Sequence, residues 1–241
     1  MKNLVFLALL ISNIFAFELQ NVISINIPKQ DDSANIKIPA MDLRVGESGI
    51  ISRIVNENEF IIANALVDEI KDGVATLSIS DFNQMNEKYM PKPLAKVSEG
   101  DKATFRILYD RAILITPNQN AYQEITSKFS EIDFLHSDIF AMFLSQEGQN
   151  MPQAKDFTKF CDKYEVGLVF ITLNDRIDIL NCSSFKKLDS VSFSLKDASV
   201  KKPFFTRLSD EGIDELFSVK KLDEYFAYFN ALVESSSETS K

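Results

Sequence analysis

The stretch AILITPNQNAYQEITSKF, residues 112–129, contains the point at which the pattern of apolar residues changes from that of a strand to that of a helix. Its first residues are mostly aliphatic or β-branched, which favours a strand. After Pro117 the apolar residues recur at helical spacing, at Ala121, Tyr122, Ile125 and Phe129. The side-chain oxygen of Asn118 can accept a free N–H group of a first helical turn. We therefore predict a helix from Asn118 to about Ser130 and a structural boundary near Pro117.

Upstream of this boundary the sequence favours short strands. Apolar and polar residues alternate in Leu19–Ile27, and further apolar runs follow at 50–55, 60–67 and 74–79. Asp72-Gly73, which separates two of these runs, is a typical hairpin turn. Several short strands at regular spacing predict a small barrel or rolled sheet.

Two other segments of this half carry weaker patterns. Pro28–Pro39 is polar and predicts a loop. Lys102–Leu108 and Ala112–Thr116 predict a second hairpin, with Tyr109–Arg111 as its turn.

Downstream of the boundary, helices and strands alternate. Ser137 or Asp138 can cap a helix that runs through Ser145, and Pro152 suits the start of a helix that ends at Tyr164. Strands are predicted at 166–173, 176–182 and 191–195, and helices at 210–217 and 221–233.

These patterns predict an α+β fold, in which a β-rich N-terminal half (a small barrel or rolled sheet) is followed by a smaller α/β C-terminal half. The predicted domains are a signal peptide at 1–16, a β-rich domain at 17–117, an α/β domain at 118–234, and a flexible polar tail at 235–241.

The N-terminus has the pattern of a secretory signal peptide. Lys2 is followed by the apolar run Leu4–Ile11, which is shorter than the roughly 20 residues of a bilayer span. We predict cleavage after Ala16, although an N-terminal core helix is an alternative. No later segment is long and apolar enough to span a membrane, so we expect a protein exported to the periplasm or cell surface.

The composition excludes several classes of function. There are 26 Lys and Arg residues against 35 Asp and Glu residues, which gives a formal net charge of −9. An acidic chain is not expected to bind nucleic acid or an anionic membrane surface. The oligomeric state is not predicted by the sequence.

Cysteine and histidine are rare. Cys161 and Cys182 are the two cysteines, and an even number in an exported protein predicts a disulfide, with two buried thiols as the alternative. His136 is the one histidine. A zinc site needs three or four protein ligands, so we predict no metal and no cofactor.

His136-Ser137-Asp138 contains the three residue types of a hydrolase triad. Triad members normally converge from separate elements, so adjacency in the sequence favours a helix start instead. We therefore predict no catalytic residues and no enzymatic activity.

An aromatic pair, Phe204-Phe205, follows Lys201-Lys202-Pro203. We predict that this pair is buried, and a contact with a partner protein is the alternative.

Several segments together resemble a known family. They are 45–50 (VGESGI), 109–118 (YDRAILITPN), 136–141 (HSDIFA), Asp156-Phe157 with Phe160-Cys161, and 166–171 (VGLVFI). The chain resembles the N-terminal domain of the plasminogen-binding proteins of epsilonproteobacteria over about residues 19–230. The resemblance implies a surface-associated, non-enzymatic protein that binds host plasminogen through lysine-dependent contacts. Members known for this activity carry a long charged extension beyond this domain, which is not part of this sequence.

Two functional hypotheses follow. In the first, the protein binds plasminogen through Lys241, whose ammonium and free carboxylate form the zwitterion that lysine-binding sites recognise, with Lys201 and Lys202 as auxiliary ligands. In the second, it is a periplasmic structural or adaptor protein of a cell-envelope machine such as the flagellar motor. A hydrolase that uses His136 is a third and weaker reading.

Overall fold

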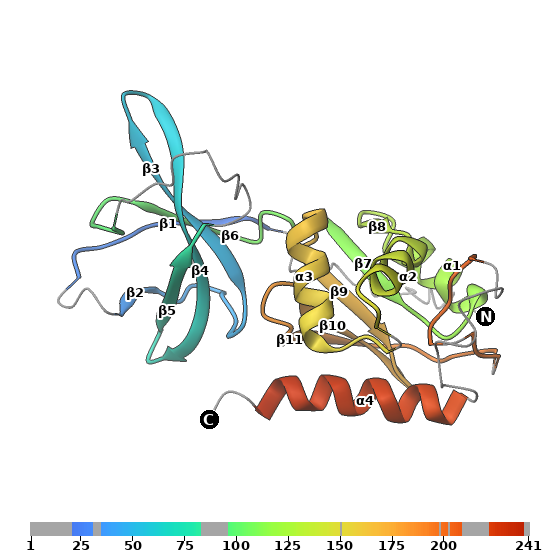
Figure 1. Ribbon diagram of the computed structural model, residues 1–241. Helices are drawn as coiled ribbons and strands as arrows, with labels where there is room; N and C mark the ends of the chain where they lie inside the picture. The colour runs from blue at the N-terminus through green and yellow to red at the C-terminus, as the bar shows by residue number, and fades with distance from the viewer. Residues whose placement is uncertain are drawn as a thin grey trace, which may run out of the picture.

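The computed structural model has an α+β fold with two β-sheets, which confirms the predicted class. It describes residues 21–30, 35–82, 96–149, 151–197, 199–201, 203–208 and 222–238. The first sheet and the second sheet with its helices lie side by side (Figure 1). The predicted signal peptide, Lys202, Lys241 and the predicted helix at 210–217 lie outside the described residues. The predicted domain limits stay predictions.

The first sheet has six strands, in the order β1-β6-β3-β4-β5-β2. All its pairs are antiparallel. Its inner face buries a core made by short aliphatic side chains and Phe105. The strands are β1 (Ile23–Asn26), β2 (Ile36–Pro39), β3 (Ser48–Val55), β4 (Asn58–Lys71), β5 (Val74–Asp81) and β6 (Lys102–Phe105).

The second sheet has five strands, in the order β11-β10-β9-β7-β8. Strand β7 pairs in parallel with both of its neighbours, β9 and β8. The other pairs, β9 with β10 and β10 with β11, are antiparallel. The strands are β7 (Arg111–Ile115), β8 (Asp133–Leu135), β9 (Leu168–Thr172), β10 (Arg176–Asn181) and β11 (Lys187–Ser192).

Helices cover both faces of the second sheet. They are α1 (Gln119–Lys128), α2 (Ser137–Gln146), α3 (Ala154–Tyr164) and α4 (Leu222–Glu238). Asn118 caps α1 as predicted, because its side chain accepts a hydrogen bond from the Ala121 N–H at 2.9 Å. Helix α4 lies along the sheet (Figure 1), and the Tyr225 hydroxyl donates to the Ile115 carbonyl at 3.2 Å.

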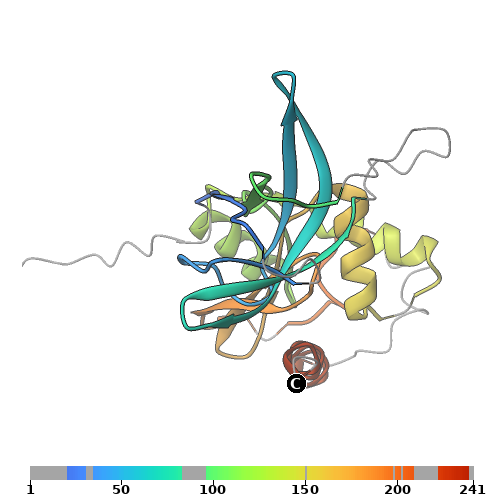
Figure 2. The same ribbon diagram turned by 90° about the vertical axis from the view of Figure 1, so that its left-hand side faces the viewer.

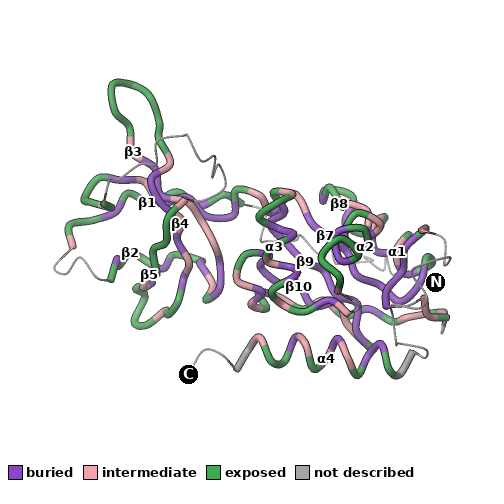
Figure 3. Tube along the Cα trace, viewed as in Figure 1, coloured by how far each residue is buried: buried purple, intermediate pink, exposed green. Residues whose placement is uncertain are grey.

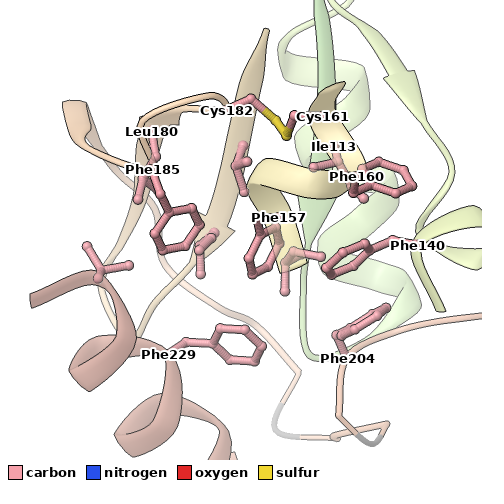
Figure 4. Close-up of a cluster of buried hydrophobic side chains, with 14 of the residues drawn as sticks. Ile113, Phe140, Phe157, Phe160, Cys161, Leu180, Cys182, Phe185, Phe204 and Phe229 are labelled. Carbon is pink, nitrogen blue, oxygen red and sulfur yellow. A yellow bond between two sulfur atoms is a disulfide. The ribbon is translucent and has the colours of Figure 1, made fainter. Parts of the chain in front are cut away.

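A cluster of aromatic side chains fills the core between the second sheet and helices α2, α3 and α4 (Figure 4). Phe140 is the centre of this cluster, with ring centroids 4.6 Å from Phe157 and 5.0 Å from Phe160. The disulfide Cys161–Cys182 ties α3 to the end of β10, as predicted. Phe204 and Phe205 are buried, which confirms burial as the reading of this pair.

The loop before β3 joins the two sheets through side-chain hydrogen bonds. Asn181 donates to the Ser48 hydroxyl and to the Tyr109 hydroxyl, both at 2.8 Å. The Ser184 hydroxyl donates to the Gly46 carbonyl at 2.7 Å. These contacts hold the end of β10 against the start of β3.

A close backbone approach supports the same junction. A Cβ atom on Gly167 would collide with the Leu108 carbonyl oxygen. Glycine is therefore required where the strand-connecting segment 106–110 crosses the chain that leads into β9.

The structure corrects three sequence-based predictions. Lys102–Leu108 and Ala112–Thr116 do not form a hairpin, because β6 pairs within the first sheet and β7 within the second. The predicted loop at Pro28–Pro39 contains strand β2, which pairs with β5. The last strand of the second sheet lies at Lys187–Ser192 rather than at 191–195.

The long β3–β4 hairpin extends beyond its neighbouring strands (Figure 2), and its outer end is exposed (Figure 3). Three apolar side chains at this end have large exposed fractions: Ile54 with 68%, Val55 with 46% and Phe60 with 53%.

Candidate functional site

The His136-Ser137-Asp138 segment begins helix α2, where His136 is the N-cap residue instead of the predicted Ser137 or Asp138. The His136 Nδ1 atom accepts a hydrogen bond from the Asp138 N–H at 3.2 Å. The Ser137 side chain is fully buried, and its hydroxyl donates to the Phe205 carbonyl at 2.6 Å. A buried hydroxyl directed at a backbone carbonyl is not placed to attack a substrate, so this geometry gives no hydrolase triad.

Asp138 is held by several donors. Its carboxylate accepts hydrogen bonds from the Thr206 hydroxyl at 2.8 Å, from the Arg207 N–H at 2.7 Å and from the Arg207 guanidinium at 2.8 Å. Burial alone would raise the pKa of Asp138, but these donors hold the pKa below its ordinary value. The carboxylate therefore connects helix α2 to the chain at 206–207.

The same environment acts on His136. Burial lowers the pKa of its imidazole, and the neighbouring Arg207 lowers it further, while Asp138 raises it. The ring packs against Tyr122, at 4.9 Å between ring centroids, and against Phe205, at 6.0 Å. These contacts are those of a structural histidine.

Lys201 is the one described member of the predicted lysine ligands. It is half-buried, and its ammonium group donates to the Leu208 carbonyl at 3.0 Å. Its backbone N–H donates to the Pro117 carbonyl at 2.8 Å. Lys202 and Lys241 lie outside the described residues, so their position relative to Lys201 stays a prediction.

A cleft of about 780 Å³ lies between the two sheets, and the sequence analysis did not identify it. One wall is the outer face of β3, β4 and β5, and the other is the last turn of α3 with the segments 166–167 and 183–184. We call this space the inter-sheet cleft. Its walls come from segments far apart in the chain, so no local sequence pattern could have predicted it.

A second hollow, of about 510 Å³, lies beside β2, which is an edge strand of the first sheet. Its lining includes Lys29 and Lys37, both exposed. The side chain of Gln30 spans from its own loop to β2, because its amide donates to the Lys37 carbonyl at 3.0 Å and accepts from the Lys37 N–H at 2.9 Å.

Within the described part of the chain, no group of three or more His, Cys, Asp or Glu side chains is placed to hold a metal ion. None of the helices described there is long and apolar enough to cross a bilayer.

Comparison with known proteins identifies the family to which this chain belongs. The family described as plasminogen-binding protein pgbA N-terminal matches residues 22–233. Two curated relatives named plasminogen-binding protein PgbA, from Helicobacter pylori strains J99 and 26695, are each 32% identical over 204 residues. Each match covers 82% of this chain and 44% of the relative, so the chain spans less than half the length of these proteins. No solved structure shows significant similarity. The chain belongs to the PgbA N-terminal family of plasminogen-binding proteins.

Proposed function

We propose that this protein is an exported, non-enzymatic binding protein that captures plasminogen through lysine-dependent contacts. The observation that carries the proposal is the family match over residues 22–233, together with relatives that are named as plasminogen-binding proteins. The match covers nearly all of the described residues, so it includes both sheets.

Lys241 is the proposed principal ligand, with Lys202 and Lys201 as auxiliaries. The ammonium group of a lysine side chain suits a site that recognises free lysine. Because the Lys201 ammonium already donates to the Leu208 carbonyl, binding through Lys201 would require breaking that hydrogen bond. The exposed Lys29 and Lys37 are the internal alternatives.

Export is supported by the pattern of residues 1–16 and by the disulfide Cys161–Cys182. Disulfides persist mainly in oxidising compartments such as the periplasm or the outside of the cell. A non-enzymatic role is supported by the structural engagement of His136, Ser137 and Asp138.

Binding of residues 17–241 to immobilised plasminogen tests the proposal. We expect deletion of Lys241 to weaken binding at least about tenfold, which is about 1.4 kcal/mol. Free lysine should compete. The matched control is Lys155→Ala, which removes an exposed lysine elsewhere on the chain and should leave affinity unchanged. Absence of binding by the unaltered chain would refute the proposal. Binding that is blocked by lysine but insensitive to Lys241 would move the site to internal lysines, which are the auxiliaries Lys201 and Lys202 or the exposed Lys29 and Lys37.

One structural observation favours the second hypothesis, a periplasmic adaptor of an envelope machine. The outer end of the β3–β4 hairpin exposes Ile54, Val55 and Phe60 together, and exposed apolar groups of this kind mark protein contacts. Replacing Phe60 with Ser should then abolish co-purification with the envelope complex while leaving the fold intact. Cell fractionation separates the two hypotheses, because a strictly periplasmic protein does not meet a host protein in intact cells.

A further inference from the structure

The inter-sheet cleft has an apolar floor. Ile50, Ile61 and Leu66 point to the outer face of the first sheet, opposite its core, and each is only half-buried. Ile107, on the segment that connects the sheets, completes the floor with an exposed fraction of 41%. Exposed aliphatic side chains gathered in a concave space favour a ligand with apolar groups of its own.

The walls of the cleft carry negative charge. Asp81 lies on the sheet wall, and Asp162 and Glu165 lie on the helix wall. The last turn of α3 adds the partial negative charge of its free carbonyl groups. No hydrogen bond or ion pair with another described residue engages the carboxylates of Asp81 and Asp162.

The two lysines of the helix wall are engaged elsewhere. The ammonium of Lys159 contacts the Glu147 carboxylate at 3.3 Å. The ammonium of Lys163 lies 5.6 Å from the ring centroids of both Phe143 and Tyr164. Among the described residues, the charges of the cleft without an ion-pair partner are therefore the carboxylates of Asp81 and Asp162 and the ammonium of Lys163, which gives a net negative charge.

The pKa of the Asp162 carboxyl group also favours binding of a cation in the cleft. Asp162 is exposed, yet partial burial of its carboxyl group raises the pKa above the ordinary value. A partly desolvated carboxylate without a described partner gains most from an added cation.

We propose that the inter-sheet cleft binds a peptide segment of a partner protein in which a Lys or Arg side chain is flanked by aliphatic residues. The aliphatic groups cover Ile50, Ile61 and Leu66, and the cation pairs with the carboxylate of Asp81 or Asp162. Charge complementarity selects the occupant, because an acidic segment would meet three carboxylates and the negative end of α3. This interaction differs from the proposed binding of plasminogen, in which lysines of this chain are the ligands.

Fluorescence anisotropy tests the proposal with residues 17–241 and a labelled nine-residue peptide, Gly-Ser-Leu-Lys-Leu-Lys-Leu-Ser-Gly. A second peptide with Glu in place of Lys is the ligand control. The cleft variant is Asp81→Asn with Asp162→Asn. The matched control is Asp68→Asn with Glu131→Gln, which removes the same charge from exposed positions outside the cleft.

At low salt we expect the cleft variant to weaken binding of the Lys peptide about tenfold and the matched control to weaken it less than twofold. The Glu peptide should not bind. Equal weakening by both double variants would show non-specific attraction and overturn the proposal, as would no binding of the Lys peptide at millimolar concentration. Circular dichroism of each variant verifies its fold. Plasminogen is not a component of this assay, so its outcome is independent of the proposed function.

Discussion

The Arg106 guanidinium and the Glu47 carboxylate form an ion pair in which the exposed fractions of the two side chains are 1% and 0%. Arg106 donates to Glu47 through Nε and Nη2 at 2.9–3.2 Å, and it also donates to the Asp42 carbonyl at 2.8 Å. Arg106 directly follows β6 and has a φ of 65°, so the pair fixes the turn where the chain leaves the first sheet. Burial raises the pKa of the Glu47 carboxyl although the Arg106 guanidinium lowers it.

Removing one partner of this ion pair should lower the free energy of unfolding more than replacing both partners with apolar residues. Glu47→Ala leaves a buried guanidinium without its main acceptor, and we expect a loss of about 3–5 kcal/mol in the free energy of unfolding. Glu47→Leu with Arg106→Met should lose less, because no uncompensated charge stays buried. Urea unfolding measures both variants. Equal losses would contradict a dominant electrostatic cost.

Gly167→Ala should disrupt the contact between the segment 106–110 and the chain before β9, because the new Cβ atom would overlap the Leu108 carbonyl oxygen. Gly73→Ala is the control, since its Cβ atom would meet open space and cost only the strain of a φ of 76°, about 1 kcal/mol. We expect Gly167→Ala to lower the melting temperature clearly more than Gly73→Ala. Similar shifts would show that the close approach can relax.

The disulfide should stabilise the α3–β10 contact. Cys161 and Cys182 are 21 residues apart, and a link over such a loop stabilises by about 3 kcal/mol in the chain-entropy description. Replacing both cysteines with Ser should lower the free energy of unfolding by about this amount. Adding a reductant should destabilise the unaltered chain but leave the double variant unchanged; a response of the double variant would point to another redox-sensitive group.

His136 should make stability depend on pH near neutrality. Its pKa in the folded state lies below the ordinary value of 6.5, so the unfolded chain binds the proton more readily. Stability is therefore full above pH 6.5 and falls as the pH decreases from 6.5 toward the lowered pKa. His136→Asn retains an N-cap acceptor but does not titrate, so the contribution of His136 to this slope should disappear. Thermal unfolding at pH 5–8 provides the comparison, and an unchanged slope in the variant would exclude His136 as its source.

The elements that the sequence predicted well are those defined by local chemistry. The Asn118 cap fixes α1, and the run 166–182 reads directly as the β9–β10 hairpin. The false hairpin around Tyr109–Arg111 had suitable strand residues on both sides. It fails because the buried Arg106–Glu47 pair and the Gly167 contact turn the chain into a second sheet, and these interactions are non-local.

The candidate sites were less predictable for the same reason. The role of Ser137 depends on the Phe205 carbonyl, and the inter-sheet cleft combines Asp81 with Asp162. The two members of each pair are separated by dozens of residues in the sequence, so no local sequence pattern predicts that they lie close together. The disulfide was predictable because only two cysteines were available.

The parallel pairing of β7 has a consequence for the order in which the protein is made. Ala112–Ile115 is fully buried, and its partner strand on one side, β9, extends to Thr172. During synthesis this aliphatic strand therefore exists for a long interval with an unpaired edge, which is a condition that promotes aggregation. The first sheet has all its strands once Phe105 has been added, whereas β7 gains its central partner only after β9 has been made.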